Sequence, residues 1–197
     1  MGAAPGYQEA FYKHLSVQLG EDVKSTADLF DGMQNDDFCV KVSAAVKQAA
    51  CGISKIAKDL RIMSSGPRAG FGEITLPSLS PGSSIMPGKI NPYMPEMLLQ
   101  IMQQVISHDM MATLTVNESD LDLCSSTCGS FLGAMESLEL IEKGFRLVAD
   151  LCIKGIQVNA ELARKNAEMS TSLATMVSAL YLSLIHISEP TRHAQIS

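Results

Sequence analysis

The chain of 197 residues has no tryptophan, little charge and few basic side chains. Only 18% of its residues are charged and 46% are hydrophobic, a balance that excludes an intrinsically disordered protein. Its 15 Lys and Arg against 21 Asp and Glu give a net charge of −6. Because phosphate binding needs clustered cations, this charge argues against a nucleic-acid partner.

Long apolar runs and targeting segments are also missing. No stretch of about 18 residues is free of charged or strongly polar side chains, so no transmembrane helix or other membrane contact is expected. The first five residues have neither a basic start nor an apolar core, unlike a signal peptide. The five cysteines, an odd number, are typical of reduced thiols. We therefore expect a cytoplasmic protein.

Metal ligands are equally scarce in the sequence. Cys124 and Cys128 are spaced to share a helix face, but no His or further Cys pair lies at ligand spacing. We interpret both cysteines as packing residues, and we expect neither a metal nor a cofactor.

Apolar residues recur with helical spacing over most of the chain. A short helix is expected within residues 5–20, ending at Gly20. Long amphipathic helices are expected at three places: 38–63, 93–116 and 130–155. Convincing alternating strands are missing. The sequence therefore predicts an all-α fold, a bundle of long helices forming one domain over residues 1–180.

Residues 64–92 interrupt this pattern and are rich in glycine, proline and serine. Roughly 29 residues without periodicity is long for a connection, and such loops are usually functional or disordered. Because predicted helices flank the segment on both sides, we interpret it as functional.

Reactive side chains are concentrated in residues 82–92, Gly-Ser-Ser-Ile-Met-Pro-Gly-Lys-Ile-Asn-Pro, here called the signature loop. Gly82 and Gly88 allow the loop to swing or to bring backbone N–H groups close to a ligand. Lys89 and Asn91 suit a carboxylate, because they offer a point charge and an amide donor. The predicted helix N-terminus that follows also favours an anion.

A serine in this loop could act as a nucleophile or as a base. A base needs N–H donors and a cation around its alkoxide. From the residues alone, an ordinary surface loop is the alternative. A phosphate-binding P-loop is excluded, because the spacing Gly-x4-Gly-Lys-Ser/Thr is absent.

The signature loop matches the pattern G-S-S-x-M-P-x-K-x-N-P and thereby resembles the fumarase/aspartase superfamily. Residues 59–74, with Ser-Ser-Gly-Pro-Arg-Ala-Gly at 64–70, and the pair Pro95-Glu96 are similar to its aspartase branch. The resemblance covers about residues 3–180. It implies a long-helix bundle of that superfamily's type, and a homotetramer whose active sites are shared between subunits.

The activity implied by the resemblance is that of a carbon–nitrogen lyase that converts L-aspartate to fumarate and ammonia. The partner is then a small dicarboxylate. Two alternatives stay open: fumarate hydratase activity within the superfamily, and a non-catalytic helical module used for association.

The resemblance also implies roles for individual residues. Ser83 corresponds to the general base that removes the β-proton of aspartate, leaving an aci-carboxylate that expels ammonia. Lys89 and Asn91 correspond to residues that bind a substrate carboxylate and stabilise its added charge. Glu96 matches a carboxylate that pairs with an active-site His of another subunit, although a first-turn Glu also complements a helix dipole. Three further residues are expected to line the closing loop: Ser84, Ile85 and Met86.

Members of the superfamily are over twice this length, so the resemblance predicts a partial chain that is inactive alone. Residues 182–192 look like a translated sequencing adaptor, and we expect a non-native, disordered tail over residues 181–197. None of the four histidines is expected to be catalytic, and His108 is interpreted as a helix-surface or interface residue.

Overall fold

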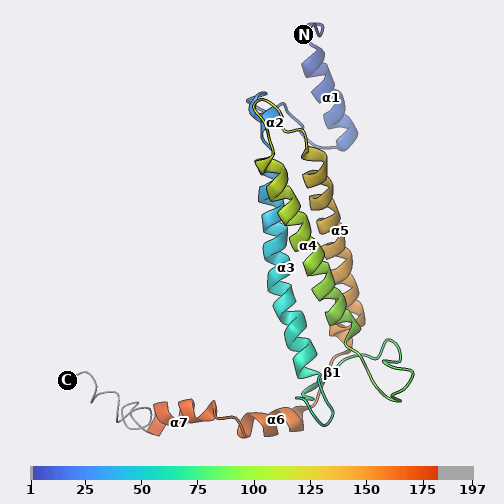
Figure 1. Ribbon diagram of the computed structural model, residues 1–197, viewed down its shortest axis with the longest axis vertical. Helices are drawn as coiled ribbons and strands as arrows, with labels where there is room; N and C mark the ends of the chain where they lie inside the picture. Colours follow the sequence, from blue (N-terminus) through green and yellow to red (C-terminus); the bar gives the residue numbers. More distant parts are fainter. Residues whose placement is uncertain (1, 182–197) are drawn as a thin grey trace, which may run out of the picture. The chain divides into compact units, whose positions relative to one another are not determined.

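The computed structural model describes residues 2–181, which are mostly helical (Figure 1). Its elements are α1 (Tyr7–Leu19), α2 (Asp31–Gln34), α3 (Asp37–Met63), β1 (Ile74–Thr75), α4 (Tyr93–Asn117), α5 (Thr127–Leu151), the 3-10 helix η1 (Ile153–Gly155), β2 (Gln157–Val158), α6 (Ala160–Glu168) and α7 (Leu173–Tyr181). The all-α prediction is confirmed. Within the described part, we find no helix that is both long enough and apolar enough to cross a membrane. Apart from Tyr181 at the end of α7, the predicted tail lies outside the described residues.

The long helices follow the predicted ranges, with one difference at α5. This helix begins at Thr127, earlier than expected, and ends at Leu151, where the chain tightens into η1. Cys124 therefore precedes the helix, so the expected shared helix face with Cys128 is wrong. Cys124 is buried and Cys128 is exposed, in agreement with different environments for the two thiols.

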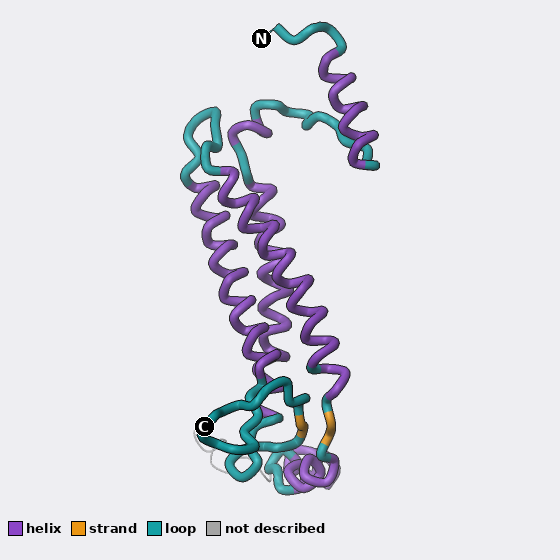
Figure 2. Tube along the Cα trace, turned by 90° about the vertical axis from the view of Figure 1, so that its right-hand side faces the viewer, coloured by secondary structure: helices purple, strands orange, loops and turns teal. Residues whose placement is uncertain are grey.

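A short antiparallel pair of strands was not predicted. Ile74 of β1 lies opposite Val158 of β2, and Thr75 lies opposite Gln157. Figure 2 shows the two strands in orange beside each other. Two residues per strand are too few to produce a recognisable alternation of polar and apolar side chains.

The chain divides into two compact units, and each of the three long helices contributes to both. Unit 1 comprises Met1–Ala50 and Met102–Ile141, and unit 2 comprises Cys51–Ile101 and Glu142–Ser197. The single domain expected over residues 1–180 stays a prediction.

Polar side chains are buried between the helices of unit 1. His108 of α4 is only 7% exposed, and its Nδ1 atom lies 2.9 Å from the Ser137 hydroxyl oxygen of α5. Of the two expected positions of His108, the helix surface is wrong, and a position at an interface between chains stays a prediction. The reason lies on the facing helix, where a Cβ atom at Gly133 would be 3.3 Å from His108 Cβ. The missing side chain of Gly133 makes room for the imidazole.

A second buried polar pair of unit 1 gives a stability prediction. The fully buried Ser130 hydroxyl donates to the buried Asp36 carboxylate. The substitution Ser130→Ala leaves that carboxylate short of a donor, so the free energy of unfolding should fall by about 1–3 kcal/mol. Denaturant unfolding followed by circular dichroism measures the change. Ser125→Ala, at an exposed position nearby, is the control and should change stability by less than about 0.5 kcal/mol. Equal stability of the two variants contradicts the prediction.

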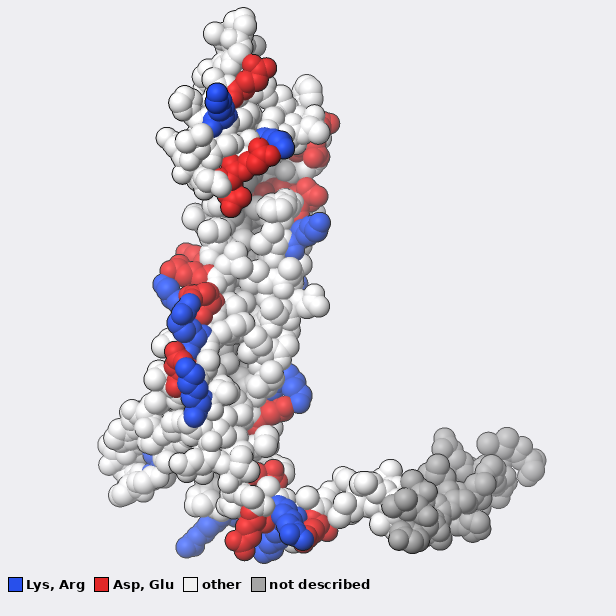
Figure 3. Space-filling model, turned by 180° about the vertical axis from the view of Figure 1, so that it is seen from behind, with Lys and Arg blue, Asp and Glu red and all other residues white. Residues whose placement is uncertain are grey.

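Unit 2 has an apolar core around β1. Its buried members are Ala57, Ile74, Leu76, Leu98, Val148 and Cys152. Burial raises the pKa of the Cys152 thiol, so this cysteine stays protonated and packs as an apolar residue. Two ion pairs with a spacing of four residues lie along the end of α5 and into η1: Arg146 with Glu142, and Lys154 with Asp150. Figure 3 shows positive and negative side chains close together along one side of the long helices.

Candidate functional site

The signature loop is closed at its base by a backbone hydrogen bond. Gly82 N–H donates to the Lys89 carbonyl oxygen at 2.9 Å. A Cβ atom at residue 82 would lie 2.6 Å from that oxygen, closer than real Cβ atoms approach, so only glycine permits this contact. Gly88 has a φ of 78°, a left-handed conformation that also favours glycine. Both glycines have a geometric role here, while the swing of the loop stays a prediction.

Ser83 lies just inside this base and receives two backbone donors. Its hydroxyl oxygen accepts hydrogen bonds from Ile85 N–H and Met86 N–H, each at 3.2 Å. Ser83 is half-buried, whereas Ser84, Ile85 and Met86 are exposed, Ile85 by 87%. Two N–H dipoles that point at one oxygen favour negative charge on it.

Lys89, Asn91 and Glu96 line a common hollow of about 1280 Å³ in unit 2. No described carboxylate forms an ion pair with Lys89, so its ammonium is available to a ligand. Gly88 also borders the hollow. The structure thus brings together the predicted substrate-binding residues and Glu96. It leaves Ser83 and the predicted loop-lining residues outside the lining of this hollow.

Two cationic side chains that border the hollow were not identified from the sequence. Lys58 and Arg61, near the end of α3, also border it. No role was assigned to either residue from the sequence. The available signal was their position in the last turns before the functional loop. With Lys89 they make the hollow rich in positive charge, which attracts anionic ligands.

The segment before the signature loop is anchored by the chain's later part. Asn159 N–H donates to the Glu73 carbonyl at 2.9 Å, and the Asn166 amide donates to the Glu73 carboxylate at 3.0 Å. Both contacts join residues far apart in the sequence, next to the β1–β2 pair. The sequence offered no signal for this anchoring.

The comparisons with known proteins agree with one another on the kind of protein that this chain resembles. A family model described as Lyase matches residues 1–107, more than half of the chain. The aspartate ammonia-lyase of Bacillus subtilis is 39% identical over 178 residues, 90% of this chain. A class II fumarate hydratase of Halalkalibacterium halodurans is 32% identical over 178 residues, again 90% of this chain. Among solved structures, a fumarate lyase:delta crystallin of Brucella melitensis superposes with a TM-score of 0.82 and 38% identity, covering 89% of this chain and 41% of that one.

The chain spans only 38% of the length of either of these two curated relatives. The alignment with the aspartate ammonia-lyase nevertheless covers most of this chain, including all three long helices and the signature loop. On the family match and these relatives, the chain belongs to the lyase family of the fumarase/aspartase superfamily.

Proposed function

We propose that the chain is part of a carbon–nitrogen lyase of the aspartate ammonia-lyase type, with Ser83 as its general base. The observation that carries this proposal is the pair of N–H groups, of Ile85 and Met86, at 3.2 Å from the Ser83 oxygen. A serine hydroxyl accepts a carbon-bound proton only when its alkoxide is stabilised. The two N–H donors supply that stabilisation in the proposed scheme.

The proposed reaction is an elimination with a simple balance of atoms. The Ser83 alkoxide takes the β-proton of L-aspartate, and the electron pair of the C–H bond moves into the adjacent carboxylate. Lys89 and Asn91 bind that carboxylate and stabilise the added charge of the aci-carboxylate. The pair then forms the Cα–Cβ double bond of fumarate as the C–N bond breaks and ammonia leaves. Ser83 finally releases its proton to solvent.

Glu96, Lys58 and Arg61 have supporting roles in this scheme. Glu96 is half-buried in the first turn of α4 and borders the same hollow as Lys89. We assign it the pairing with a histidine of another subunit. Lys58 and Arg61 attract the doubly charged substrate to the hollow.

The same proposal includes assembly into a homotetramer with shared active sites. Large apolar side chains are exposed on the long helices: Met110, Leu114, Phe131, Leu132 and Met135 are each more than half exposed. Extensive exposed apolar surface is typical of an interface between chains. Light scattering after size exclusion measures the mass of the assembly.

A cytoplasmic location completes the proposal. All five cysteines are free thiols, and Cys51 and Cys128 are exposed. Exposed free thiols persist in a reducing compartment.

Complementation tests the proposed activity. The chain is co-expressed with the part of the Bacillus subtilis aspartate ammonia-lyase that it does not match, and fumarate is followed by its ultraviolet absorbance. We expect fumarate from L-aspartate with the complemented protein and none with the chain alone. Fumarate from malate instead of aspartate would assign a hydratase. A stable complex with neither activity would support an association module.

A further inference from the structure

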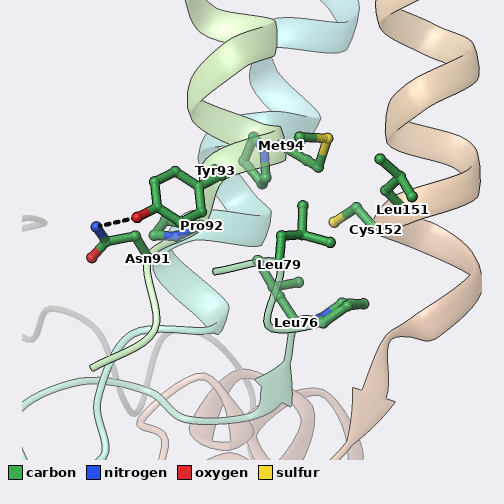
Figure 4. A pocket seen from close by; sticks show the side chains of 10 residues that line it. Leu76, Leu79, Asn91, Pro92, Tyr93, Met94, Leu151 and Cys152 are labelled. Carbon is green, nitrogen blue, oxygen red and sulfur yellow. Dashed lines mark hydrogen bonds between the residues drawn. The ribbon is translucent and has the colours of Figure 1, made fainter. Parts of the chain in front are cut away.

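The hydroxyl of Tyr93 links both ends of the signature loop. Tyr93 is the first residue of α4, and its hydroxyl donates to the Pro81 carbonyl at 3.2 Å, just before the loop. The same oxygen accepts a hydrogen bond from the Asn91 side-chain amide at 3.4 Å, at the other end of the loop (Figure 4). One side chain therefore contacts the chain on both sides of the Gly82–Lys89 hydrogen bond.

These contacts occupy both hydrogens of the Asn91 amide. The Asn91 nitrogen donates to the Gly82 carbonyl at 3.1 Å and to the Tyr93 hydroxyl at 3.4 Å. A side-chain amide nitrogen carries two hydrogens, so its orientation is set before any ligand arrives. The longer contact, to Tyr93, is the weaker of the two. An arriving carboxylate can take the hydrogen that points at Tyr93, while the contact to Gly82 keeps the amide in place.

We propose that Tyr93 is a positioning residue that holds the base of the signature loop closed and orients the Asn91 amide toward a substrate carboxylate. The orienting role rests on the proposed function, whereas the closing role does not. The ring of Tyr93 is half-buried and borders a small cleft that Pro92, Leu79 and Met94 also line (Figure 4). Its hydroxyl is fixed at the loop base by the hydrogen bonds to Pro81 and Asn91, as a positioning residue requires.

Limited trypsin digestion of the full chain tests the closing role. The bond after Lys89 lies at the loop base, and the bond after Arg68 lies in another exposed segment of the same chain. The substitution Tyr93→Phe keeps the ring but removes both hydrogen bonds of the hydroxyl. Cleavage after Lys89 should become about three- to tenfold faster, because cleavage tracks the population of the open loop. Cleavage after Arg68 and the melting temperature should stay unchanged.

Tyr7→Phe is the matched control, since Tyr7 is 61% exposed on α1. This variant should change the rate of cleavage neither after Lys89 nor after Arg68. Equal acceleration at both bonds in Tyr93→Phe would reveal a general loss of stability and would overturn the proposal. Unchanged cleavage after Lys89, or equally fast cleavage of both bonds in the unsubstituted chain, would overturn it as well.

Kinetics of the complemented enzyme test the orienting role separately. We expect Tyr93→Phe to raise KM for L-aspartate about fivefold and to change kcat less, because the amide must now be ordered during binding. An unchanged KM in an active enzyme would overturn the orienting role. If no variant produces fumarate while cleavage after Lys89 still accelerates, the proposed function fails and the closing role stands.

Discussion

The substitution Ser83→Ala should abolish fumarate formation by the complemented enzyme almost completely. It removes the only oxygen to which Ile85 and Met86 direct their N–H groups within the described loop, and with it the proposed base. General base catalysis contributes about 10²–10⁴-fold to a rate, so we expect kcat to fall by that factor. KM should change little, because Lys89 and Asn91 still bind the carboxylate. Steady-state kinetics with L-aspartate, followed by absorbance of fumarate, measures both constants.

Ser80→Ala is the control for this experiment. Ser80 is exposed and lies just before the signature loop, where no catalytic contact is assigned to it. Its activity should equal that of the unsubstituted enzyme. Turnover by Ser83→Ala at the unsubstituted rate would remove Ser83 as the base. A rise in KM with an unchanged kcat would instead assign it to substrate binding.

Gly82→Ala should reduce kcat/KM by about 100-fold, because a misplacement of about 1 Å in an active site has effects of that size. The new Cβ would lie 2.6 Å from the Lys89 carbonyl oxygen and 2.9 Å from its carbonyl carbon. Both atoms belong to the backbone, so neither can move aside alone. The loop ends must separate, and Lys89 and Asn91 move with them. The same kinetic assay measures the loss, and thermal unfolding should show little change because the loop is exposed.

Gly52→Ala is the matched glycine control. Gly52 is exposed within α3, and a Cβ atom there meets nothing within 4 Å of this chain. Alanine in a helix interior is about 1 kcal/mol more favourable than glycine, so this variant should keep its activity and gain some stability. Full activity of Gly82→Ala would show that the loop works without the close approach of its ends.

Asn91 and Tyr93 show which site residues a local sequence pattern can identify and which it cannot. Asn91 was found because the signature pattern contains it, and the structure places it with Lys89 beside one hollow. Tyr93 was missed, because its importance depends on the Pro81 carbonyl, twelve residues earlier in the chain. A polar aromatic residue directly after Asn-Pro was the only available signal.

His108 shows the opposite case, in which the local pattern misled. The sequence indicated a helix-surface or interface residue, but on the facing helix α5 Gly133 leaves space for His108 and Ser137 provides a hydrogen-bond partner. Apolar periodicity along one helix contains no information about gaps on another.

The amino-acid sequence by itself determined the helical class, the ranges of two of the three long helices and the family. Helix formation follows from side chains a few residues apart, and the signature is a contiguous run, so both are local properties. Only the tertiary structure decided which groups meet. The cations from α3 at the hollow and the contacts of Glu73 with Asn159 and Asn166 depend on how distant segments pack. The closure of the loop by Gly82 and Lys89 and the Tyr93 contacts depend on how residues 81–93 fold back on themselves. Both kinds of contact are set by shape and by the pairing of polar groups in three dimensions, which a pattern of residue types does not specify.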